Sequence, residues 1–249
     1  MFDKWRWPTM FALLGLILAG VWLAMAKEQQ MKQESTPFVG LSNQALAHAV
    51  AQGDTQQIGV LAAPESVRQR GERQVTMLQW AILAQQPTSV RALLQAGADA
   101  AQTGLDGNSA LHTAAQIEDA EYLSQLLTSG ASVNVGNSVT GATPLAAAVL
   151  AGREKQVKVL LEAGANSSLA DRLGDTPLHV AAKTNAPQLA IMLLQAGADA
   201  KARNQQGLTF LAYFSQTPSH LQNEAMREAY KRLEAWLRAH RLATQYASS

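Results

Sequence analysis

Apolar and polar positions recur with one period along most of the chain. A six-residue pattern begins with Thr or Ser, has Leu at its third position and ends mostly in small residues. Its copies begin at Thr76, Ser109, Thr143, Thr176 and Thr209, in steps of 33, 34, 33 and 33 residues. Leucine pairs followed by a glycine keep the same spacing, and those glycines are Gly97, Gly130, Gly164 and Gly197. A period of this length over several copies predicts a stacked repeat array.

Each unit has the features of two short helices joined by turns. The leading Thr or Ser is a good N-cap because its hydroxyl accepts a hydrogen bond from an unpaired backbone amide. Pro144 and Pro177 follow such caps, where the fixed φ of proline suits the first helical turn. The leucine pair belongs to the second helix, and the glycine after it can adopt the left-handed conformation that ends a helix. The pattern therefore predicts an all-α fold.

These motifs resemble the ankyrin repeat, in which a turn and two antiparallel helices stack into a curved array. The resemblance covers roughly residues 43–242 and implies an ankyrin-repeat solenoid of about five to six repeats, including degenerate end repeats. The 34-residue step implies one extra residue near Gly136 to Gly141. A last helix is expected from about residue 219 to residue 242, because a solenoid end without a cap exposes an apolar face.

The ankyrin resemblance also implies a binding surface for a protein partner. In such arrays the hairpin tips and the exposed side of the first helices form a concave groove. The positions expected to line it are Leu105, Asp106, Asn108, Ile117, Val139, Thr140, Leu150, Arg172, Leu173, Asp175, Lys183 and Leu208. The aliphatic members of this set are expected to form one exposed apolar patch, as at a partner interface. The alternative is that some of them pack beneath the hairpin of the next repeat.

The N-terminal part of the sequence predicts a targeting or membrane-anchoring segment. Residues 8–26 are nineteen consecutive residues without a charged side chain, long enough as a helix to cross a hydrocarbon core of roughly 30 Å. Lys4 and Arg6 precede this run, which predicts that the chain after it lies across the membrane, facing the periplasm. Residues 1–26 are either a signal peptide cleaved after Ala26 or a single transmembrane anchor forming an N-terminal hydrophobic helix.

Two further expectations concern the residues around the array. The polar residues 27–42 are expected to be a tether, and residues 243–249 a short tail. Translation from Met25 or Met31 would give a minor cytoplasmic form that keeps the repeat array and lacks the N-terminal targeting segment.

Composition and motifs argue against a catalytic, metal or cofactor site. The chain has no cysteine, which excludes disulfides, thiolate metal sites and cysteine nucleophiles. A net charge of +1 does not favour nucleic acid as a partner. The sequence contains no HExxH, GxSxG or GK[ST] motif. We therefore expect no catalytic, cofactor or metal site, and a monomer when unbound. By the ankyrin resemblance, His112 and His179 are expected to bond the backbone of the adjoining turn.

The size, the N-terminal targeting segment and the repeats resemble those of exported bacterial ankyrin proteins, and this resemblance implies two candidate functions. One is an immunity protein that binds and neutralises an antibacterial lipase effector delivered by type VI secretion. The other is a periplasmic adaptor that supports an envelope or peroxide-defence enzyme.

Overall fold

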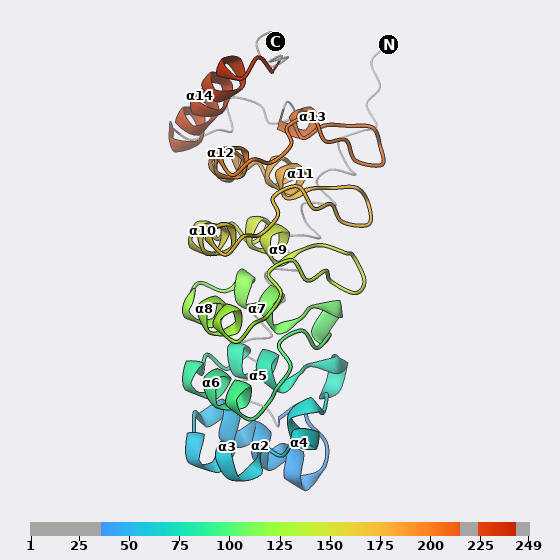
Figure 1. Ribbon diagram of the computed structural model, residues 1–249, viewed down its shortest axis with the longest axis vertical. Helices are drawn as coiled ribbons and strands as arrows, with labels where there is room; N and C mark the ends of the chain where they lie inside the picture. The colour runs from blue at the N-terminus through green and yellow to red at the C-terminus, as the bar shows by residue number, and fades with distance from the viewer. Residues whose placement is uncertain (1–35, 215–223, 243–249) are drawn as a thin grey trace.

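The computed structural model describes residues 36–214 and 224–242, and these residues form an elongated stack of helix pairs (Figure 1). The first helices of the pairs are α2 (Leu41–Gln52), α5 (Met77–Leu83), α7 (Ala110–Gln116), α9 (Pro144–Leu150), α11 (Pro177–Lys183) and α13 (Leu211–Phe214). The second helices are α3 (Thr55–Leu61), α6 (Pro87–Gln95), α8 (Glu121–Thr128), α10 (Glu154–Glu162), α12 (Pro187–Gln195) and α14 (Glu224–Ala239). Three short helices lie in the connections: α4 (Pro64–Arg68), η1 (Glu72–Gln74) and η2 (Leu105–Gly107).

First helices contact first helices and second helices contact second helices along the stack. Thus α7 packs on α5 and α9, while α8 packs on α6 and α10. The connections between successive pairs extend sideways as hairpin loops along one edge of the stack (Figure 1). The predicted all-α ankyrin solenoid is confirmed for the described residues, whereas the N-terminal hydrophobic helix expected at residues 8–26 lies outside them. Among the described helices, none is both long and apolar enough to cross a membrane.

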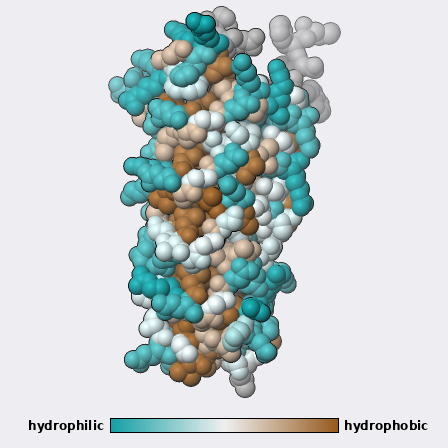
Figure 2. All heavy atoms as spheres, viewed as in Figure 1, coloured by the Kyte–Doolittle hydropathy of each residue, from teal (hydrophilic) through white to brown (hydrophobic). Residues whose placement is uncertain are grey.

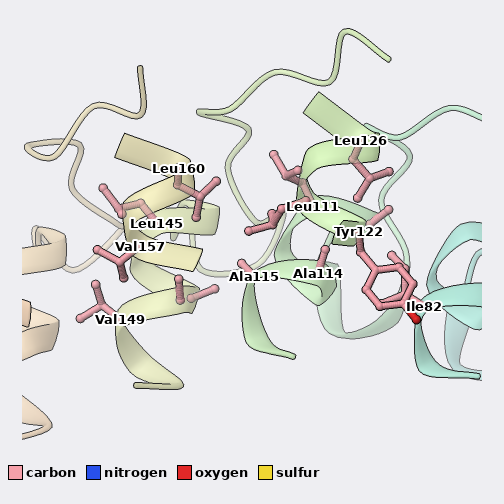
Figure 3. Packing of buried hydrophobic residues seen from close by; sticks show 14 of the residues in the cluster. Ile82, Leu111, Ala114, Ala115, Tyr122, Leu126, Leu145, Val149, Val157 and Leu160 are labelled. Atoms are coloured by element: carbon pink, nitrogen blue, oxygen red, sulfur yellow. The ribbon is translucent and has the colours of Figure 1, made fainter. Parts of the chain in front are cut away.

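The core is made by the leucines of the repeat pattern. Leu111 and Leu126 from one pair, and Leu145 and Leu160 from the next, have no exposed surface (Figure 3). Small residues such as Ala114, which is also fully buried, take little space and let the helix pairs approach closely (Figure 3). In the space-filling view, apolar residues form a band along the length of the stack between hydrophilic flanks (Figure 2).

The local signals act as the sequence predicts. The hydroxyls of Thr76 and Thr143 accept hydrogen bonds from the amides of Gln79 and Ala146, each at 3.2 Å. The glycines after the second helices have positive φ angles, 83° at Gly164 for example, which stops each helix at little steric cost.

The extra residue of the 34-residue step lies in one hairpin. The fourth hairpin (residues 137–142) is closed by a bond from Asn137 N to Ala142 O, 2.8 Å long. The fifth hairpin (residues 171–175) is closed between Asp171 N and Asp175 O, 2.9 Å apart, and is one residue shorter. The fourth hairpin therefore carries the insertion, within the range that the sequence predicted.

The ends of the array differ in part from expectation. Phe38 is only 1% exposed and packs in the core, and the first helix begins at Leu41. The folded array thus starts before residue 43, and the last residues of the expected tether belong to it. At the other end α14 lies within the expected residues 219–242 and buries Leu233 and Leu237 against the array.

Candidate protein-binding surface

Hydrogen bonds between neighbouring hairpins hold their tips in a continuous row. Ser138 N donates to Gly107 O at 2.9 Å and joins the fourth hairpin to the third (residues 104–108). Arg172 N donates to Thr140 O at 2.8 Å and joins the fifth hairpin to the fourth. Gln205 N donates to Leu173 O at 3.0 Å and joins the sixth hairpin (residues 204–208) to the fifth. The tips therefore form one braced surface.

The longer fourth hairpin is held by hydrogen bonds within it and by others from the fifth hairpin. Inside it, Asn137 Oδ1 accepts hydrogen bonds from the amides of Val139 and Thr140, each at 2.8 Å. From the fifth hairpin, the Arg172 guanidinium donates to Val139 O at 2.7 Å and to Ser138 O at 2.8 Å. These bonds fix the backbone of Val139, whose side chain stands in solvent.

The expected aliphatic positions divide into two groups. Val139, Leu150, Leu173 and Leu208 are exposed, with 61%, 42%, 63% and 37% of their surface accessible. Leu105 and Ile117 are instead half-buried, and Ile117 packs against the hydrophobic core. The expected exposed patch is therefore narrower than six residues and is carried by the fourth, fifth and sixth units.

The polar positions in the third and fourth hairpins are exposed or half-buried. Asp106 is exposed and pairs with Arg73 at 3.1 Å across the neighbouring hairpin. Asn108 Oδ1 accepts a hydrogen bond from Asn137 Nδ2 at 2.6 Å, which links two hairpins. Thr140 is exposed at the tip of the fourth hairpin.

Asp175 differs from the expectation of an exposed groove residue, because it is only 5% exposed. One of its oxygens pairs with the Lys183 ammonium, and the other accepts a hydrogen bond from Asn204 Nδ2 at 2.9 Å. The carboxylate is thus a buried structural link between the fifth and sixth units. Lys183 lies over the ring of Tyr213, with Nζ at 4.8 Å from the ring centroid. The sequence reasoning missed Tyr213, which stands in a degenerate copy of the repeat motif.

The two motif histidines have the expected structural role. Ser109 N donates to His112 Nδ1 at 3.3 Å, and His112 Nε2 donates to Ala142 O in the next hairpin at 2.9 Å. His179 repeats this arrangement with Thr176 N at 3.2 Å and Leu208 O at 3.0 Å. Burial lowers the pKa of His112, and its bond to Ala142 opposes that effect. In the described part of the chain, no three His, Asp or Glu side chains come together as a metal site would need.

This geometry, a stack of helix pairs with a braced row of hairpins, is that of an ankyrin-repeat protein. A family model described as ankyrin repeats (3 copies) matches residues 86–171 and 111–204. The chain belongs to the ankyrin-repeat family, and its array is a protein-interaction module.

Relatives and solved structures agree with this assignment. Protein PhlB of Serratia liquefaciens is 66% identical over 164 residues, which make up 66% of this chain and 72% of PhlB. The E3 ubiquitin-protein ligase KEG of Arabidopsis thaliana is 39% identical over 87 residues, which are 34% of this chain and only 5% of KEG. The crystal structure of the ankyrin repeat domain of Bcl-3, a member of the IkappaB protein family, matches with a TM-score of 0.66 and 26% identity. That match covers 77% of this chain and 85% of the Bcl-3 domain.

Proposed function

We propose that this chain is an immunity protein that faces the periplasm and neutralises a lipase-type antibacterial effector by binding it. The observation that carries the binding role is the set of exposed aliphatic side chains on the braced hairpins and on α9. Val139 and Leu173 lie mostly in solvent and contribute little to the core, so folding alone does not account for them. Apolar side chains grouped on a rigid, exposed surface are typical of a partner interface.

The periplasmic location rests on the uncharged residues 8–26 and on the basic residues before them. A reporter that is active only outside the cytoplasm, fused after Ser249, is expected to be active. Deleting residues 8–26 should abolish that activity. A fusion that works only as a cytoplasmic reporter would contradict the proposed location.

The binding role is tested by changing Leu150 to Asp. The substitution places a charge against an apolar partner, and an unpaired charge is costly to desolvate. Because Leu150 is the last residue of α9, the new carboxylate also opposes the helix dipole, by about 0.3–1 kcal/mol. A cost of that size lowers the melting temperature by only a few degrees, roughly 2–4 °C per kcal/mol.

The matched control is Lys158→Asp on the second helix of the same unit, where Lys158 is exposed and pairs with Glu162 at 3.8 Å. The gene beside this one is expected to encode a lipase-type protein, and binding to that protein is measured together with survival of cells that receive it. Leu150→Asp should lose both binding and protection, and Lys158→Asp should keep both. If the unaltered chain instead binds a catalase-type enzyme and gives no protection, the adaptor function replaces the immunity function.

A further inference from the structure

The charged side chains around the exposed aliphatic residues are already engaged within the array. The Arg172 guanidinium is bonded to the carbonyls of Ser138 and Val139. Lys183 pairs with Asp175, and Asp106 pairs with Arg73. One oxygen of Asp171 accepts hydrogen bonds from the amides of Leu173 and Asp175, at 2.8 and 2.9 Å. An apolar partner surface can therefore cover this region while these groups keep their hydrogen bonds within the array, which lowers the cost of such burial.

Val139 and Leu173 form the most prominent part of this surface, and we call these two residues the tip ridge. They stand on adjoining hairpins joined by the bond from Arg172 N to Thr140 O. The bonds from Val139 N to Asn137 and from Arg172 to Val139 O fix the backbone of Val139 before any partner arrives, and 61% of the surface of this residue is exposed. A preorganised apolar ridge loses little conformational freedom on binding, so more of its burial contributes to affinity.

We propose that the tip ridge binds the apolar surface with which the lipase-type partner holds the acyl chains of its substrate. An enzyme that acts on lipids must present such a surface, because acyl chains leave the lipid phase only for another apolar environment. Its chemistry matches that of the ridge, which is aliphatic and surrounded by charged groups that already hydrogen-bond within the array. This inference rests on the proposed function, and it adds that inhibition works by covering the acyl-binding surface.

The first arm of the test uses the full chain and variants of the ridge. Val139→Asp and Leu173→Asp should each weaken binding to the lipase-type protein at least about tenfold, as expected for central interface residues. Val60→Asp is the control, because Val60 is 85% exposed on α3, far along the array from the ridge. The melting temperature of each of the three variants is measured as well, to check that it folds.

The second arm changes the partner. The lipase-type protein is inactivated with a phosphonate that carries a long alkyl chain or, as the control, only a methyl group. The long chain occupies the acyl-binding surface, so it should weaken binding of the unaltered chain at least about tenfold, and the methyl form should not. Equal binding of the two forms, or full binding by both ridge variants, overturns the inference and leaves the proposed function standing. Absence of binding by the unaltered chain overturns both.

Discussion

Replacing His112 with Gln should remove a pH dependence from the stability of the array while preserving its hydrogen bonds. The chain itself provides the precedent, because Gln79 occupies the same position of an earlier repeat. Thr76 N donates to Gln79 Oε1 at 3.1 Å, and Gln79 Nε2 donates to Asn108 O at 3.1 Å. His112 makes the same pair of bonds through its two ring nitrogens.

The sign of the effect follows from burial. Desolvation lowers the pKa of His112 below its ordinary value of 6.5, so the folded state binds a proton less readily than the unfolded state. As pH falls through 6.5, the unfolded state gains a proton that the folded state does not, and stability falls. One proton changes the free energy of unfolding by at most about 1.4 kcal/mol per pH unit. His112→Gln lacks this contribution, and the other histidines contribute equally to both proteins.

Urea denaturation followed by circular dichroism at pH 5, 6, 7 and 8 measures the difference. The two proteins should be similar at pH 8, and His112→Gln should gain relative to the unaltered chain as pH falls below 6.5. His112→Ala, which resembles Ala146 in the next unit, should lose both bonds and be less stable at every pH, by about 1–3 kcal/mol. Parallel stability curves for His112→Gln and the unaltered chain would refute the reasoning.

Three further substitutions test the packing, each by the free energy of unfolding in urea. Leu160→Ala removes a side chain with no exposed surface and should cost about 2–5 kcal/mol, and a loss below about 1 kcal/mol would contradict its place in the core. Phe38→Ala should cost about 3–5 kcal/mol, whereas a neutral result would mean that the fold begins after this residue. Asn185→Ala should cost about 1–3 kcal/mol, because Asn185 has a φ of 55° and accepts a hydrogen bond from Tyr230 of α14. An unchanged value there would argue against docking of α14 on this turn.

The repeat period made much of the fold predictable. Caps, leucine pairs and terminal glycines are local signals, so the sequence located the two helices of each repeat and placed the insertion near residues 136–141. Leu160 and Leu193, which belong to two of the leucine pairs, are fully buried, and the insertion lies in the fourth hairpin. Phe38 carried no such signal, because a single aromatic residue beside a polar stretch has no period to place it.

The binding surface was less predictable, because exposure depends on neighbouring units as well as on position in the repeat. Asp175 occupies a groove position, yet Asn204 and Lys183 enclose its carboxylate. Ile117 is also one of the positions expected to line the groove, but it packs against the core. The bracing of Val139 depends on Arg172, a residue of the following repeat, and only the structure shows that contact.

Hydroxyl-radical footprinting of the full chain, alone and with the lipase-type protein, tests the central claim most directly. The claim is that the exposed aliphatic residues of the fourth and fifth units meet the partner. Val139, Leu150 and Leu173 should become protected in the complex, while Val39 and Val60, exposed to 76% and 85% near the other end of the array, should react as before. Protection of α14 or of the second helices, with those three residues unchanged, would contradict the claim.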